Sequence, residues 1–149
     1  MRILGLDYGA HTVGVAASDE LFLTAQPVET IRRERENAIR GTLCRLETLA
    51  RGRDVALLVL GLPLNMDGSE GERAAVTRAF GERLKKRLGL PVVFSDERLT
   101  SVEAEERLRE QGLSARQRAE AIDTMAAVVI LEEYLGRHRE ALQNGQLLG

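Results

Sequence analysis

Apolar positions near the start of the chain follow the patterns of β-strands. Residues 3–7 are apolar or small without interruption up to Asp7, which is typical of a strand buried on both faces. Residues 12–18 form a second small and β-branched run, and residues 28–31 a third. Gly9 supports a tight turn between the first two runs. These segments predict three antiparallel strands, with the first strand central in its sheet.

Helical spacing and two further strands follow. A helix is predicted to begin near Glu34, because apolar residues then recur on one face. Residues 55–60 are the most apolar stretch and predict a buried strand, and residues 91–94 predict a short one. Since both are reached through helices, they should run parallel to the first strand by right-handed crossovers. The prediction is an α/β domain over residues 1–149, with a five-stranded mixed sheet and helices on both faces.

Helix starts are suggested by three sequence pairs that fit the capping box. Residues 125–131, inside the last long helix, are all apolar and predict a helix packed on most of its circumference. The tail beyond Arg139 is predicted to fray. The capping pairs are Ser69 with Glu72, Thr100 with Glu103, and Ser114 with Gln117.

Composition limits the class of protein. The 149 residues carry a net charge of −2, so no overall basic field favours tight non-specific DNA binding. The single cysteine, Cys44, excludes an internal disulfide and is interpreted as a small packing residue. Basic clusters such as Arg32, Arg33 and Arg35 are interpreted as solvated helix faces or ends. No apolar run approaches the roughly 20 residues of a membrane helix, which favours a cytoplasmic protein.

Three acidic positions stand out against this pattern. Asp7 ends a buried strand, where it could serve a site or cap the following turn. Asp96 and Glu97 lie where a strand becomes a loop, at the sheet edge where parallel α/β folds bind ligands, although solvated loop acids are also common there. Asp123 shares a helix face with apolar residues, and it could equally serve the helix dipole.

Together, these acids predict a metal site. Like charges held close together repel one another and require a cation. Oxygen ligands without a Cys or His cluster favour Mg²⁺ or Mn²⁺. A pair of such ions about 3.5–4 Å apart is the arrangement that cleaves phosphodiesters. The residues alone do not distinguish Asp96 from Glu97 as the second ligand.

Four stretches then match a known family in order and at its spacing: GLDYG…GVAASD at 5–19, GLPLNMDGSEG at 61–71, DERLTSVEAEERL at 96–108 and IDTMAAVVILEEYL at 122–135. The chain resembles the YqgF/RuvX family of RNase H-fold proteins, also described as Holliday junction resolvase-like proteins or pre-16S rRNA nucleases. This resemblance implies an RNase H-like sheet, divalent metal, and nuclease action on structured RNA or DNA. The family's catalytic and metal-binding acids map onto Asp7, Glu97 and Asp123.

Candidate substrate-binding residues lie beside these acids: Gly9, His11, Asn65 and Arg98. Asn65 belongs to the loop of residues 61–71, whose glycines allow close approach to a phosphate. Family members usually carry basic residues just after the DYG motif, whereas this chain has Ala10 and His11 there. His11 could take over part of that contact.

Four functions are compatible with these patterns. The first is a metal-dependent endonuclease that processes the 5′ end of pre-16S rRNA, and the second is a Holliday junction resolvase acting on branched DNA. A resolvase normally works as a two-fold dimer, and the sequence leaves open a monomer or a homodimer. The third is a non-catalytic RNA- or protein-binding module. The fourth, an actin-like ATPase, is disfavoured because it needs a second domain.

Overall fold

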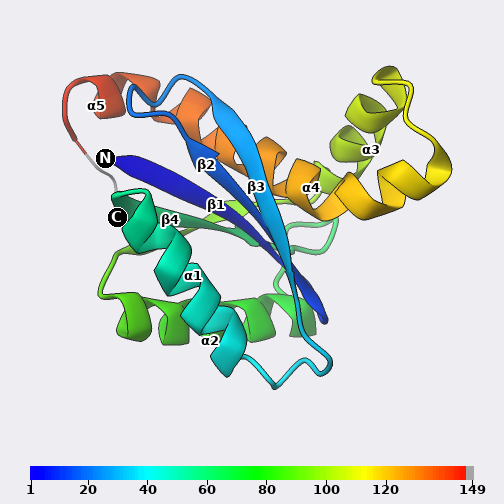
Figure 1. The fold of residues 1–149 in the computed structure, drawn as a ribbon, viewed down its shortest axis with the longest axis horizontal. Helices are drawn as coiled ribbons and strands as arrows, with labels where there is room; N and C mark the ends of the chain where they lie inside the picture. The colour runs from blue at the N-terminus through cyan, green and yellow to red at the C-terminus, as the bar shows by residue number, and fades with distance from the viewer. Residues whose placement is uncertain (147–149) are drawn as a thin grey trace.

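Strand β1 (Arg2–Tyr8) is the central strand of a five-stranded mixed sheet, as predicted (Figure 1). The computed structural model describes residues 1–146. The strand order is β3-β2-β1-β4-β5, with β1 antiparallel to β2, β2 antiparallel to β3, and β1, β4 and β5 parallel. The other strands are β2 (Thr12–Ser18), β3 (Ala25–Arg32), β4 (Val55–Leu62) and β5 (Val92–Asp96).

Helices cover both faces of this sheet (Figure 1). Side chains alternate along β1, so Leu4, Leu6 and Tyr8 pack in the core with α1 (Arg40–Gly52) and α2 (Glu72–Leu88). Ile3 points the other way and packs with α4. The remaining helices are α3 (Thr100–Glu110), which packs on α4, then α4 (Ala115–Arg137) and α5 (Arg139–Gln143).

Helix α4 packs across β1, β2, β3 and β4, and its continuous apolar run supplies the contacts. Residues 126–131 are all buried, which confirms the predicted helix packed on most of its circumference. Gly5 of β1 helps to bring α4 close: a Cβ at Gly5 would lie 2.7 Å from the Cβ of Leu131. The absent side chain therefore sets how closely this helix approaches the sheet.

Two predictions about α1 were wrong. The helix begins at Arg40 rather than near Glu34, because residues 33–39 form the connection that carries the chain from β3 to the helix. The apolar spacing noted in the sequence is correct from Ile39 onward, where the side chains are buried. Cys44 is exposed and is not the packing residue that was predicted.

The capping box at Ser114 is confirmed. The Ser114 hydroxyl accepts a hydrogen bond from the backbone N–H of Gln117 at 3.2 Å, and the Gln117 side chain accepts one from the backbone N–H of Ser114 at 2.8 Å. This reciprocal pair fixes the start of α4.

The other two predicted capping boxes do not form. The Ser69 hydroxyl donates to Asp67 instead, and α2 begins after Gly71. Thr100 is already the first residue of α3, so the cap position falls on Leu99, whose side chain has no acceptor. In both cases the sequence pattern was present, but the backbone entered the helix at a different residue.

The end of the chain packs more than predicted. Leu142 of α5 is buried against the α4 side of the sheet, so the segment after Arg139 is anchored rather than frayed. Residues 147–149, the last part of the predicted tail, lie outside the described residues. No helix in the described part of the chain is long and apolar enough to cross a membrane.

Candidate functional site

Three parallel strands bring the predicted acids to one edge of the sheet. Strands β1, β4 and β5 run in the same direction, so Asp7, Leu62 and Asp96 share the edge at their carboxyl ends. The backbone N–H of Glu97 donates to the carbonyl oxygen of Leu62 at 3.2 Å. This bond holds the residue after β5 against the end of β4, beside β1.

Asp7 and Glu97 form a direct carboxyl pair. Their side chains share a hydrogen bond, and both are largely shielded from water. The space for this pair comes from Gly61 of β4, because a Cβ there would lie 2.7 Å from Oε2 of Glu97 and 2.6 Å from Cδ1 of Ile130. A larger residue at position 61 would displace the Glu97 carboxyl group.

Asp123 reaches the same place from α4. Gly14 of β2 pairs directly with Asp7 in the sheet. A Cβ at Gly14 would lie 1.9 Å from the carbonyl oxygen of Asp123, so only glycine allows the α4 backbone to pass this close. The approach places the charge of Asp123 near enough to Asp7 to raise the pKa of Asp7.

Burial and mutual repulsion shift both carboxyl groups of the pair. Burial raises the pKa of Asp7 to about 6, the hydrogen bond from Glu97 opposes this rise, and the negative charge of Asp123 adds to it. Burial, and then the negative charge of Asp7, raise the pKa of Glu97 to about 8, while the nearby cation of Arg73 opposes the rise. Burial and mutual repulsion therefore favour a proton shared between the two carboxyl groups.

These raised pKa values predict a pH dependence of stability in the absence of metal. The folded state holds more protons than the unfolded chain between about pH 4.5 and pH 8. The free energy of unfolding should therefore be highest below this window. As pH rises through it, that free energy should fall by about 1.4 kcal/mol per pH unit for each extra proton held. Chemical denaturation in EDTA across the window measures the slope.

The variant Glu97→Gln is the control for this slope. It keeps the shape and the hydrogen-bond donor but cannot ionise, so the pH dependence should flatten. A parent protein whose free energy of unfolding stays constant or rises across the window would contradict the raised pKa values of the pair.

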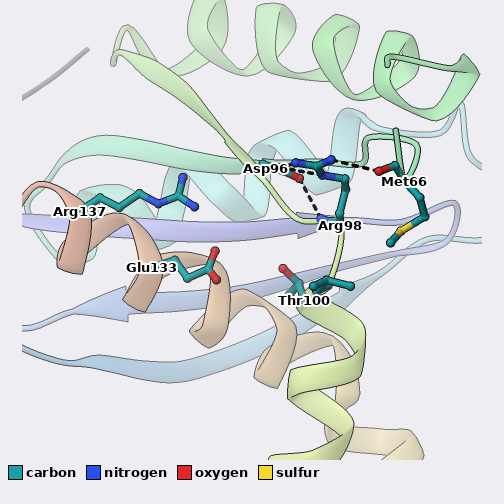
Figure 2. Close-up of a pocket in the computed structure, with 7 residues that line it drawn as sticks. Met66, Asp96, Arg98, Thr100, Glu133 and Arg137 are labelled. Atoms are coloured by element: carbon teal, nitrogen blue, oxygen red, sulfur yellow. Dashed lines mark hydrogen bonds and ion pairs between the residues drawn. The ribbon is translucent and has the colours of Figure 1, made fainter. Parts of the chain in front are cut away.

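Asp96 binds Arg98 and not Asp7. The Arg98 guanidinium donates to the Asp96 carboxylate at 2.8 Å, and this contact lowers the pKa of Asp96. Figure 2 shows Arg98 directed toward Asp96 and toward the backbone carbonyl of Met66, to which it donates at 3.2 Å. Of the two adjacent acids that the sequence could not separate, Glu97 is the one that meets Asp7.

A pocket of about 250 Å³ lies on this side of the site, and Arg137 and Glu133 of α4 form its far wall (Figure 2). The exposed side chains of Met66 and Leu99 line its mouth. Arg98, a predicted substrate-binding residue, is therefore oriented by Asp96 and Met66 at the border between this pocket and the acids.

The Asn65 side chain makes its contacts within the loop that follows β4. Its Nδ2 donates to the Ser69 hydroxyl at 2.9 Å, and its backbone N–H donates to the Ser69 carbonyl at 2.9 Å. Its amide also packs against Gly71, where a Cβ would lie 3.3 Å from Oδ1 of Asn65. The side chain predicted to bind substrate braces the loop that follows β4 at the edge of the acids.

Gly9 and His11 lie in the turn between β1 and β2. The Gly9 carbonyl accepts a hydrogen bond from the Arg33 guanidinium, and the His11 carbonyl accepts one from the Arg33 backbone N–H at 2.8 Å. The His11 side chain is exposed. Arg33, the residue after β3, therefore holds the turn that follows the DYG motif.

Sequence reasoning missed two arginines at this edge. The guanidinium carbons of Arg33 and Arg73 lie 4.6 Å and 5.9 Å from the centroid of the Tyr8 ring. Arg73 also forms an ion pair with Glu36. The position of Arg33 could have been inferred from strand direction. Because β1 is antiparallel to β2 and β2 is antiparallel to β3, β3 runs in the same direction as β1 and ends at the same edge of the sheet. Arg73 follows the loop predicted to lie at this edge, so its position could also have been inferred.

The three predicted metal ligands do not form one ligating group. Within residues 1–146, no set of three or more His, Cys, Asp or Glu side chains is placed to hold a metal ion. The structure joins Asp7 to Glu97 and brings the charge of Asp123 into range of Asp7. The chemistry of this pair still fits a hard cation. The shared proton reduces the repulsion between the two carboxylates, and a divalent cation bound to their oxygens would reduce it in the same way.

Proteins with similar sequences are named as nucleases. A model of the family RuvX, described as "Holliday junction resolvase", matches residues 1–137. A protein of Agathobacter rectalis is 49% identical over 135 residues, covering 91% of this chain and 94% of its own length. One of Symbiobacterium thermophilum is 51% identical, with 91% and 92% covered. Both carry the name "Putative pre-16S rRNA nuclease".

Solved structures share the fold at low sequence identity. Thermus thermophilus RuvC in complex with a Holliday junction substrate has a TM-score of 0.58 at 12% identity, covering 96% of this chain and 98% of that one. The Holliday junction resolvase of fowlpox virus has a TM-score of 0.52 at 11% identity, covering 92% and 99%. The RNase H-like fold predicted from the resemblance is confirmed. With the family match spanning residues 1–137 and relatives about half identical along nearly their whole length, this chain belongs to the RuvX family.

Proposed function

We propose that this chain is a divalent-metal-dependent endonuclease that processes the 5′ end of pre-16S rRNA in the cytoplasm. The observation that carries the proposal is the buried carboxyl pair of Asp7 and Glu97 at the carboxyl ends of β1 and β5. A buried acid pair with raised pKa values is costly to maintain and is typical of a functional site. The substrate is taken from the names of the relatives.

Asp7 and Glu97 would hold the cation, with Asp123 as the third acid beside them. A divalent cation bound there supplies Lewis-acid stabilisation of the phosphate charge and activation of water. Binding of a cation would require the pair to release its shared proton, and both carboxylates could then serve as ligands. Gly61 keeps the space in which the Glu97 carboxyl group adjusts.

Basic side chains around the pair would bind the backbone of the nucleic acid. Arg73 is close enough to Glu97 to oppose the rise of its pKa, so it can meet a phosphate at the acids. Arg98 follows Glu97 in the chain, His11 lies in the turn after β1, and both exposed side chains can contact neighbouring phosphates. The Gly9 turn and the loop braced by Asn65 hold these groups at the edge through backbone hydrogen bonds.

A resolvase acting on branched DNA is the second candidate, favoured by the description of the family. The two functions would use the same acids, so only the preference for one substrate distinguishes them. The discriminating experiment offers the purified chain a transcript of the pre-16S rRNA 5′ leader and a four-way DNA junction, with Mg²⁺, with Mn²⁺ and with EDTA.

The expected result is cleavage of the transcript with either metal, no cleavage in EDTA, and cutting of the junction at least about tenfold slower. Paired symmetrical cuts in the junction without cleavage of the transcript would favour the resolvase. Binding of both nucleic acids without cutting of either would favour a non-catalytic module.

A further inference from the structure

A second cavity of about 440 Å³ lies next to the site, and none of the roles given above uses it. It opens between the connection from β3 to α1 and the outer face of α2, beyond the end of β1. In Figure 1 this connection and the first turns of α2 lie together at the tip of β1. The wall and rim of the cavity include Tyr8, Asn37, Ile39, Val76, Phe80 and Arg83.

The wall is apolar and aromatic. The rings of Tyr8 and Phe80 are stacked, with centroids 4.0 Å apart and planes 12° from parallel. Both rings and Ile39 are buried, so they form the floor of the cavity, and the half-buried Val76 lies beside them. An apolar cavity with a few polar groups at its edge is the usual form of a site for a flat organic group.

The rim holds two polar groups without partners. Within residues 1–146, neither the Asn37 amide nor the Arg83 guanidinium makes a hydrogen bond or ion pair, and both residues are exposed. Glu36 also lines the cavity, but its carboxylate is paired with Arg73, and Arg33 is bound to backbone carbonyls. An amide offers a donor and an acceptor to a base edge, and a free guanidinium suits a phosphate.

Two residues, Tyr8 and Arg73, lie between the cavity and the acid pair. Tyr8 directly follows Asp7, and its side chain turns to the other face of β1. Arg73 lies over the Tyr8 ring at 5.9 Å and also acts on Glu97 by its charge. A strand whose phosphate meets Arg73 at the acids can therefore place its next base toward the cavity.

We propose that this cavity binds one unpaired nucleobase of the strand held at Asp7 and Glu97, a proposal that rests on the proposed nuclease function. The base would lie over Val76 and Ala79, above the floor of Tyr8 and Phe80, with its edge at Asn37 and the following phosphate at Arg83. A base inside a duplex is stacked and cannot enter. The site therefore selects a strand with an unpaired nucleotide next to the cut.

The chain offers a matched pair of variants for the test. Ala79 of α2 lines the cavity, whereas Ala75, one turn earlier on the same helix, does not, and both are exposed. Ala79→Phe would fill the cavity and Ala75→Phe would add the same ring outside it. Both are made in an Asp7→Asn chain, so that affinity is measured without cleavage, and thermal melting checks that they fold.

The probe is a fluorescent RNA hairpin with a short single-stranded flank, used intact and with an abasic nucleotide at each flank position in turn. The Asp7→Asn chain should lose about tenfold in affinity at one abasic position. Ala79→Phe should bind the intact RNA about tenfold more weakly and lose its sensitivity to that position, while Ala75→Phe should behave as the parent. Equal weakening by both variants, or an abasic series without effect, would overturn the proposal.

A second pair covers the case in which Ala79→Phe disturbs the helix. Arg83→Glu and Lys86→Glu reverse one exposed charge each on α2, and only Arg83 lines the cavity. Arg83→Glu should weaken binding of the flanked hairpin several-fold more than that of a fully paired duplex, whereas Lys86→Glu should weaken both alike. The same ratio for both variants would contradict the role of the cavity.

Failure of this proposal and failure of the nuclease proposal give different results. Abasic sensitivity in a chain whose intact form never cuts RNA would support the base site and overturn the nuclease. Metal-dependent cutting by a chain that is insensitive to the abasic series would support the nuclease and overturn the base site.

Discussion

Replacing Asp7 by Asn or Glu97 by Gln is expected to lower the rate of RNA cleavage by about 10³-fold, with the fold intact. Each change removes a charge and keeps the shape of the side chain. The Asp7–Glu97 contact already carries a proton at neutral pH, so an amide in place of one carboxyl preserves a hydrogen bond between them. The variants should therefore remain folded at the assay temperature, and the loss should appear in the cleavage rate.

Single-turnover cleavage of the leader transcript measures these rates, and the double variant tests whether the two residues act as one unit. If they do, the double variant should be no more than slightly slower than either single variant. Asp123→Asn should also slow cleavage, because the charge of Asp123 acts on Asp7.

Asp54→Asn is the matched control. Asp54 immediately precedes β4, at the sheet edge opposite the acids, and its φ of 52° is one that Asn tolerates. Its cleavage rate should equal that of the parent. Unchanged cleavage in the Asp7 and Glu97 variants would place the active site elsewhere or identify a contaminating nuclease.

Gly14→Ala is expected to lower the free energy of unfolding by about 3 kcal/mol and the melting temperature by about 10 °C. The added Cβ would lie 1.9 Å from the carbonyl oxygen of Asp123, and that atom belongs to the rigid backbone of α4. The helix must move away from β2, which loosens the core on this face. Because Asp123 moves with the helix, cleavage should fall even at temperatures where the variant is fully folded.

Gly136→Ala on the same helix is the control, with the opposite sign. A Cβ at Gly136 would meet nothing within 4 Å, and the residue is exposed. Alanine should raise helix stability by about 1 kcal/mol without changing cleavage. Denaturant titrations of both variants measure the difference. A Gly14→Ala protein as stable as the parent would show that α4 does not depend on this close approach.

Periodicity alone determined much of the fold. The uninterrupted apolar run of residues 3–7 predicted a central strand, and the sheet order confirms it. The run of residues 125–131 predicted a helix packed on most of its circumference. Such predictions succeed because burial on one or both faces constrains every residue of an element, so many positions carry the same signal.

Signals that depend on one residue were less reliable. The capping pattern at Ser114 formed, whereas those at Ser69 and Thr100 did not, because the backbone entered each helix at another position. Likewise, the sequence placed Asp96 and Glu97 at the right edge but could not choose between them. Their side chains diverge, and Arg98 binds one while Asp7 binds the other.

The pairings that build the site were decided by tertiary structure. Gly14 makes room for Asp123, and Gly61 makes room for Glu97, through contacts between elements far apart in the chain. Arg73 reaches the Tyr8 ring in the same way. A local pattern reports whether a residue is buried, since burial repeats with the period of its own helix or strand. Which distant residue it meets depends on strand order and helix approach, and no local period contains that information.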